Sequence, residues 1–190
     1  MSPTPADQAL ENLKQGNQRF REDRMTGAGR DRTRRVELAE GQQPFAAILG
    51  CADSRVSPEI AFDTGLGELF VVRVAGNLAN TSSMASIEYA LAVLGTKLVV
   101  VMAHTSCGAV GAAIAGGAPS DSLEHLLAQI RPAIETSGAD EVDAVAWRSA
   151  RLSAKRLGEK SDIIRNAVEK EGARIVTAFY HLETGEVEFE

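Results

Sequence analysis

Four short apolar runs constrain the fold of this chain more than any other feature of its sequence. They occupy residues 45–50, 69–75, 98–103 and 174–180. The runs are rich in β-branched residues and lack the polar alternation of a half-exposed strand, a pattern typical of strands buried on both faces of a parallel sheet. The sequence therefore predicts four buried strands, each too short to be a membrane span.

Helical patterns separate these runs. Apolar residues at helical spacing occur between Pro5 and Gly27, and over residues 82–94, 123–134, 142–157 and 160–171. A turn at Gly185 allows residues 187–190 to return beside the last run as an antiparallel edge strand. Alternation of strands and helices is typical of an α/β fold. We predict a central, mostly parallel sheet of four strands plus an antiparallel C-terminal edge strand, flanked by helices.

The length of 190 residues is that of one domain with a substantial core. We predict a single domain over residues 1–190, with an N-terminal helical arm over about residues 1–35. Residues 21–35 are rich in Arg, Asp and Gly, and we expect them to form a solvated connection.

Charge and targeting signals bear on partners and location. A net charge of −6 argues against a general nucleic-acid surface. No apolar run reaches the roughly 18 residues of a membrane span, and residues 1–8 lack the apolar core of a signal peptide. We therefore expect a cytoplasmic enzyme with reduced thiols and no nucleic-acid or membrane partner. A transit or signal peptide that was removed before residue 1 stays an open alternative.

Two cysteines and one histidine stand where predicted strands end. Cys51 follows the first run, His104 follows the third, and Cys107 lies three residues beyond His104. Ligands of open α/β sheets bind outside the carboxyl ends of the strands, so the three side chains converge if their strands are adjacent. Two thiolates, an imidazole and an open fourth position are typical of a catalytic zinc site. A disulfide or two buried free thiols are the alternatives.

Asp53 and Arg55 follow Cys51 at a spacing of two residues, which on an extended turn points both side chains the same way. A carboxylate beside zinc can accept the proton of a water in a hydrogen bond, and a bidentate arginine can keep that carboxylate ionised. The alternative is that Asp53 and Ser54 only cap a turn. Next to a predicted ligand, the catalytic pair is favoured.

These residues lie within a longer pattern. The segments CADSR (51–55), FVVRVAGN (70–77), SIEYA (86–90), HTSCG (104–108) and GAV (108–110) occur in this order. Together the segments resemble the signature of the β-class carbonic anhydrases. The resemblance is strong over residues 42–113, and the remainder of the chain is compatible in pattern only.

The resemblance implies one zinc ion per subunit, held by Cys51, His104 and Cys107, with Asp53 and Arg55 as the catalytic pair. It implies reversible hydration of carbon dioxide to bicarbonate and a proton by a zinc-activated water. The subunits of such enzymes form homodimers or homotetramers, and the apolar face of the N-terminal helix before Glu22 would embrace a partner.

The resemblance also implies a substrate pocket beside the metal at the dimer interface. By motif position, Gln42 would reach across to bicarbonate, while Phe70, Ala75 and Tyr89 would line the pocket. Core packing is the alternative for Phe70 and Tyr89.

Regulation in the family gives one further expectation. Some members become inactive when the aspartate binds zinc as its fourth ligand and displaces the water. One regulated subgroup has a tryptophan three residues before the first zinc ligand. This chain has Ile48 there, which argues against that subgroup's second bicarbonate site. We predict that near neutral pH Asp53 stays paired with Arg55.

Two other functions fit the same residues. Some proteins on this scaffold hydrolyse carbonyl sulfide or carbon disulfide with the same zinc ligands. A zinc-stabilised module without catalysis is the third possibility, although structural zinc sites usually have four protein ligands, so Asp53 would have to serve permanently as the fourth.

Overall fold

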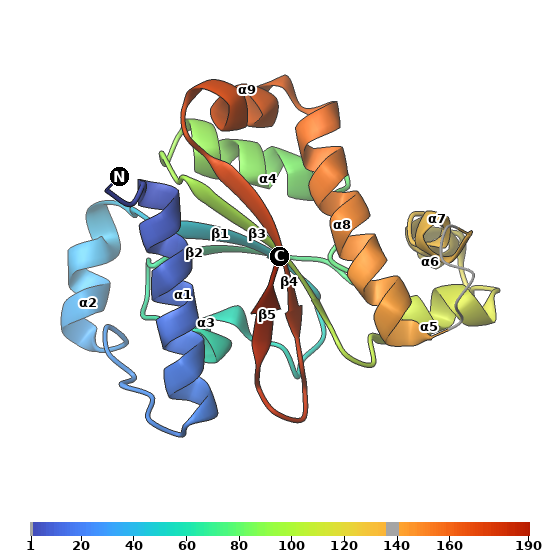
Figure 1. Ribbon diagram of the computed structural model, residues 1–190, viewed down its shortest axis with the longest axis horizontal. Coiled ribbons are helices and arrows are strands. Elements are labelled where there is room, and N and C mark those ends of the chain that lie inside the picture. Colours follow the sequence, from blue (N-terminus) through green and yellow to red (C-terminus); the bar gives the residue numbers. More distant parts are fainter. Residues whose placement is uncertain (1, 136–140) are drawn as a thin grey trace.

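The computed structural model describes residues 2–135 and 141–190 and contains a five-stranded sheet in the order β2-β1-β3-β4-β5 (Figure 1). The strands are β1 (Ala46–Gly50), β2 (Leu69–Arg73), β3 (Leu98–His104), β4 (Arg174–Tyr180) and β5 (Val187–Phe189). The first four are parallel, and β5 pairs with β4 in the antiparallel direction. The predicted fold class is confirmed, including the C-terminal edge strand.

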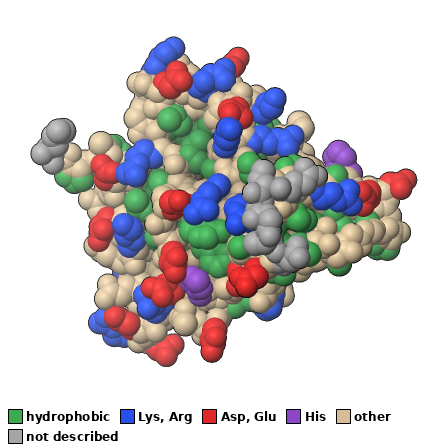
Figure 2. Space-filling model, turned by 45° about the vertical axis from the view of Figure 1, so that its right-hand side comes forward, with side chains coloured by type: hydrophobic (Ala, Val, Ile, Leu, Met, Phe, Trp, Pro, Cys, Tyr) green, Lys and Arg blue, Asp and Glu red, His purple; other side chains and the backbone are tan. Residues whose placement is uncertain are grey.

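The helices of the described residues have the following bounds: α1 (Pro5–Arg21), α2 (Arg32–Glu37), the 3₁₀ turn η1 (Leu38–Glu40), α3 (Pro58–Ala61), α4 (Thr81–Ala92), α5 (Gly108–Ala115), α6 (Asp121–Ala128), α7 (Arg131–Glu135), α8 (Val142–Lys160) and α9 (Asp162–Lys170). Among the described residues, no helix combines the length and apolarity that crossing a bilayer requires. Figure 2 shows a face on which acidic and basic side chains are interspersed.

Helices cover both faces of the sheet, which explains why the apolar runs lack polar alternation. Every residue of β1 and β3 is buried. Ile48 and Val100 face the side covered by α1, whereas Leu49 and Val101 face the side covered by α4, α8 and α9. Because β1 and β3 lie in the middle of the sheet between the two cores, each of their side chains is removed from water, whereas the edge strand β2 is only partly buried.

Helix α1 packs on the sheet of its own chain. Its apolar residues Ala9 and Leu13 are buried against the β1 and β3 face. Gly16 allows this approach, because a Cβ at that position would lie 1.9 Å from the Phe62 carbonyl oxygen. The apolar face that was expected to embrace a partner subunit is therefore covered within the chain.

The predicted helix over residues 123–134 is wrong as a single element. The chain forms α6 and α7 instead, with a tight turn in which Ile130 N donates to Leu127 O at 2.9 Å. Pro132 has no N–H to continue a helix, and its ring would collide with the carbonyl of Ala128 four residues earlier. The turn places the Ile130 side chain in the core, where it is fully buried.

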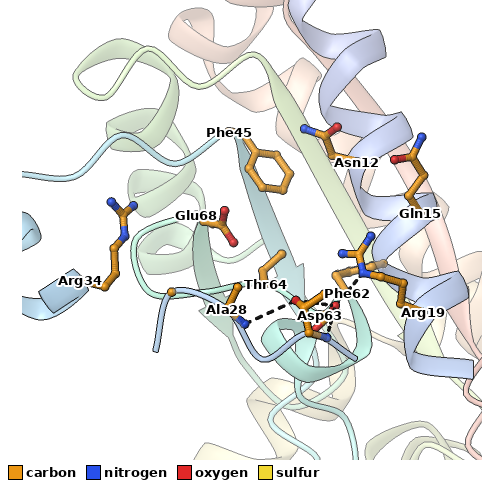
Figure 3. A pocket seen from close by; sticks show the side chains of 12 residues that line it. Asn12, Gln15, Arg19, Ala28, Arg34, Phe45, Phe62, Asp63, Thr64 and Glu68 are labelled. Atoms are coloured by element: carbon orange, nitrogen blue, oxygen red, sulfur yellow. Dashed lines mark hydrogen bonds and ion pairs between the residues drawn. The ribbon is translucent and has the colours of Figure 1, made fainter. Parts of the chain in front are cut away.

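No residue of the segment 21–35 is buried, as expected for a solvated connection, but several of its side chains bind the rest of the domain. Asp31 caps α2, and Arg30 donates to the Thr64 carbonyl. Asp63 anchors the segment. Its buried carboxylate accepts hydrogen bonds from Arg19 Nε at 2.6 Å, Thr26 N at 3.0 Å and Gly27 N at 3.2 Å. Figure 3 shows Asp63 and Arg19 facing one another. Both residues line a polar hollow with a volume of about 270 Å³.

Asp63 should make stability depend on pH. Burial opposes its ionisation, but Arg19 and the Thr26 and Gly27 amides outweigh burial and lower the pKa of Asp63 to about 2. The unfolded pKa is about 3.9, so this carboxylate stabilises the fold above pH ~4, and the stabilisation is lost as pH falls from ~4 to ~2. We expect Asp63→Asn to lower the free energy of unfolding by about 2 kcal/mol at pH 7.

The measurement is urea unfolding of the wild type and the variant between pH 3 and pH 7. The difference between them should shrink below pH ~4. A difference that stays constant over this range would show that the Asp63 charge does not stabilise the arm.

Candidate metal centre

Sheet topology brings Cys51 and His104 together. Strands β1 and β3 are neighbours with Gly50 opposite Met102, so the residue after β1 lies beside the last residues of β3. Cys107 is the N-cap residue of α5, three residues after His104. The thiol sulfurs and a ring nitrogen of these residues all lie within 4.8 Å of one another, and all three side chains are buried. The described residues thus contain a compact two-sulfur, one-nitrogen donor group.

The two cysteines are not bonded to each other. Both are free thiols, and their sulfurs are 4.0 Å apart. A disulfide requires a sulfur–sulfur distance of about 2.05 Å. The separation is instead compatible with two sulfurs on adjacent corners of one metal's coordination shell, since each Zn–S distance is about 2.3 Å.

The imidazole of His104 is oriented toward this group. Its Nδ1 lies 2.9 Å from the Thr105 carbonyl oxygen, which fixes the proton on Nδ1. Nε2 therefore carries the lone pair, and it is buried without a hydrogen-bond partner among the described residues. An orphaned buried acceptor costs free energy unless something binds it. A metal ion held between Cys51 and Cys107 would satisfy Nε2, so the residues present fit zinc.

The thiol pair favours a bound cation. The hydrogen bond donated by Cys107 outweighs burial and lowers the pKa of Cys51 to about 4. The same hydrogen bond, together with burial and the Cys51 charge, raises the pKa of Cys107. Burial disfavours charge on His104 as well, but the Cys51 thiolate raises its pKa overall. One thiolate forms readily, and a second beside it requires a positive ion.

Asp53 and Arg55 form a bidentate pair beside the donor group. Arg55 Nε donates to Asp53 Oδ1 at 2.9 Å, and Nη2 donates to Oδ2 at 2.7 Å. These bonds outweigh partial burial and hold the pKa of Asp53 well below its usual range. Asp53 Oδ2 lies 3.9 Å from His104 Nε2. Asp53 also caps its own turn, since the Arg55 amide donates to Oδ1 at 3.0 Å, so the turn-capping role and the pairing coexist.

Four hydrogen bonds at the site were not foreseen from the sequence. Arg73 donates through Nε to the Cys51 carbonyl at 2.9 Å and through Nη2 to the Asp53 carbonyl at 2.5 Å. The Gly76 amide donates to the Cys51 sulfur at 3.3 Å. Asp143 accepts a bond from the Ser106 amide at 2.7 Å. The only signal for Arg73 was that it is the one charged residue within the predicted strand over residues 69–75.

Three of the predicted pocket residues lie on or next to β2 and α4, and the fourth, Gln42, lies apart from them. Phe70 on β2 and Tyr89 on α4 form an aromatic pair with ring centroids 6.1 Å apart, and Ala75 is half-buried just after β2. Tyr89 is 47% exposed, so core packing does not account for it. Gln42 is exposed between η1 and β1, and within the described part of the chain its side chain has no hydrogen bond.

Comparison with known proteins agrees with this geometry. A family model described as carbonic anhydrase matches residues 46–187. Carbonic anhydrase 2 of Mycobacterium tuberculosis is 38% identical over 180 residues, covering 91% of this chain and 87% of the relative. Carbonic anhydrase of Mycolicibacterium smegmatis is 37% identical over 183 residues, covering 93% and 89%.

A solved structure extends the likeness to three dimensions. The β-carbonic anhydrase CcaA superposes with a TM-score of 0.73 at 27% identity, covering 96% of this chain and 87% of that one. The residues matched by the family model include the donor group, the Asp53–Arg55 pair and strands β1 to β4. The chain belongs to the β-class carbonic anhydrase family.

Proposed function

We propose that this protein is a zinc-dependent carbonic anhydrase that interconverts carbon dioxide and water with bicarbonate and a proton. The observation that carries the proposal is the convergence of Cys51, His104 and Cys107 next to an ionised Asp53. Three protein donors leave one position of a tetrahedral ion open, as a catalytic zinc site requires.

Each residue of the site has its own role in the proposed reaction. Cys51, His104 and Cys107 would hold the zinc ion, which when bound lowers the pKa of water and makes it a nucleophile near neutral pH. Asp53 accepts a hydrogen bond from the attacking water and orients it. Arg55 keeps Asp53 ionised and fixes its plane through the bidentate bonds.

We also propose which residues contact the substrate. Phe70, Ala75 and Tyr89 would supply an apolar wall suited to carbon dioxide, which carries no charge. Gln42 would donate its amide to bicarbonate across a subunit interface. Its exposed position supports a role toward a neighbouring subunit.

The alternatives have weaker support. A permanent structural zinc site would need Asp53 as its fourth ligand, yet both carboxylate oxygens accept bonds from Arg55. Hydrolysis of carbonyl sulfide or carbon disulfide would use the same ligands. The relatives that cover about nine-tenths of the chain are named carbonic anhydrases, which favours carbon dioxide.

A homodimer or homotetramer is part of the proposal. Strand β2 forms one edge of the sheet, and among the described residues no strand pairs with its outer side, so its backbone groups can pair with a strand of another subunit. Near it Tyr89 is 47% exposed and Val93 64% exposed. We place the interface at β2 and α4, because the apolar face of α1 is already covered. A cytoplasmic location is proposed from the two free thiols, and the lack of a nucleic-acid partner is proposed from the net charge of −6.

The test is a stopped-flow assay of purified, zinc-loaded protein with carbon dioxide, carbonyl sulfide and carbon disulfide. Rapid hydration of carbon dioxide, with little sulfide released from the other two gases, is expected. Negligible hydration together with rapid release of hydrogen sulfide would replace this function by the hydrolase alternative.

A further inference from the structure

We propose that Asp143, in the first turn of α8, is a positioning residue that holds the ligand loop (residues 104–107) and, through it, the Arg55–Asp53 pair. The proposal rests on the proposed function and adds a residue to its site. Asp143 lies 37 positions from the Ser106 amide that it binds, on a helix separate from the strands and the helix that carry the three metal donors.

The ligand loop needs such support because of its backbone. Ser106, between His104 and Cys107, has a φ of 53°, in the left-handed region that favours glycine. A non-glycine residue persists there only when its surroundings fix it. The Ser106 amide donates to Asp143 Oδ1 at 2.7 Å, a short bond to a charged acceptor.

The preceding residue is held by different contacts. The Thr105 amide donates to the Tyr180 carbonyl at 3.0 Å, and the Thr105 hydroxyl accepts from the Leu182 amide at 3.0 Å. Thr105 is thus tied to the end of β4. Asp143 is the contact that ties the next residue, Ser106, to α8.

A continuous series of bonds leads from Asp143 to the catalytic carboxylate. The Ser106 carbonyl accepts from Arg55 Nη2 at 3.2 Å, and the same nitrogen donates to Asp53 Oδ2 at 2.7 Å. The amide and carbonyl of Ser106 belong to different peptide units, and their relative direction depends on the dihedral angles of Ser106. By fixing the amide, Asp143 therefore helps to fix where the carbonyl meets Arg55.

A simpler role for Asp143 must be separated from this one. An acidic residue in the first turn also stabilises a helix by interacting with its dipole. That effect depends on charge, whereas the bond to Ser106 needs only an oxygen acceptor. Asn at position 143 keeps the acceptor and removes the charge, and Ala removes both.

Glu141 supplies the matched control. It lies at the N-cap of the same helix, is exposed, and makes no side-chain capping bond. Glu141→Ala removes one negative charge from the same helix end without touching the ligand loop.

The first experiment measures carbon dioxide hydration by the zinc-loaded wild type and by Asp143→Ala, Asp143→Asn and Glu141→Ala. We expect Asp143→Ala to lower kcat by about 10-fold or more with KM nearly unchanged, as for other residues that support metal-site groups. Asp143→Asn and Glu141→Ala should stay within about threefold of the wild type. Equal losses in the Ala and Asn variants, or a kcat for Asp143→Ala within about threefold of the wild type, would overturn the proposal.

The second experiment does not depend on turnover. Zinc transfer to a chromogenic chelator should be about 10-fold faster from Asp143→Ala than from the wild type, because the loop that carries two ligands is less constrained. Adding Ser106→Gly to Asp143→Ala should slow the transfer again, since glycine adopts the left-handed conformation without help. The single variant Ser106→Gly is measured as well, so that the two changes and their combination form a double-mutant cycle.

Transfer rates equal to the wild type in Asp143→Ala, or no recovery in the double variant, would contradict the positioning role. If the wild type itself does not hydrate carbon dioxide, the proposed function fails, and the zinc transfer rates still decide whether Asp143 holds the loop.

Discussion

Replacing Cys51 by alanine is expected to abolish zinc binding and carbon dioxide hydration together. The change removes one of three protein donors and leaves His104 and Cys107, a set too small for a stable site in a protein that uses three. Zinc per chain after dialysis against a weak chelator should fall from about one to near zero, and hydration should fall to the rate of buffer alone. Atomic emission spectroscopy and stopped-flow kinetics on the same samples check both.

Ser54→Ala is the matched control, because Ser54 is exposed in the same turn and offers no ligand to the site. It should keep its zinc and its activity. Circular dichroism of both variants verifies that the fold persists. Full zinc content in folded Cys51→Ala would mean that the metal lies elsewhere.

Replacing Asp53 by asparagine is expected to separate metal binding from turnover. Asparagine fills the same space but cannot act as an ionised acceptor, so the attacking water loses its orientation. Zinc should remain at about one per chain, while kcat falls by roughly 10²–10⁴-fold, the usual contribution of a positioned proton acceptor. Metal analysis and initial rates at saturating carbon dioxide provide the measurement.

Arg55→Lys is the informative companion. Lysine keeps the positive charge near Asp53 but cannot reproduce the two parallel bonds from Nε and Nη2. We expect a smaller fall in kcat than for Asp53→Asn. Loss of zinc from Asp53→Asn, with a drop in thermal stability, would instead favour the structural-zinc alternative.

The strands and the donor group could be predicted because both depend on features that the sequence carries directly. Strands buried on both faces, such as β1 and β3, must be apolar at successive positions. Parallel strands end at the same edge of a sheet, so residues that follow two neighbouring strands meet there. That is why Cys51 and His104 could be expected together without knowledge of the register.

The break between α6 and α7 could not be read from apolar periodicity. Leu123, Leu127, Ile130 and Ile134 continue the helical spacing across the turn. The break is decided by the missing N–H of Pro132 and by the space available to Ile130 in the core. A periodic pattern records which face is buried, and it does not record whether the backbone is continuous.

Long-range bonds from side chains to the backbone were also beyond the sequence. Arg73 binds the carbonyls of Cys51 and Asp53, and Arg30 binds that of Thr64. Any carbonyl can accept such a bond, so no residue type marks the partner in advance. The arginines of residues 21–35 therefore read as solvated although Arg30 and Arg34 attach the arm to the loop before β2.

The most direct test of the central claim is zinc K-edge X-ray absorption of the purified protein, combined with metal analysis. The account predicts about one zinc per chain with two sulfur ligands near 2.3 Å and one nitrogen near 2.0 Å, plus one further light atom. A protein without zinc, or a shell without sulfur and a Cys51–Cys107 disulfide in the mass spectrum, would contradict it.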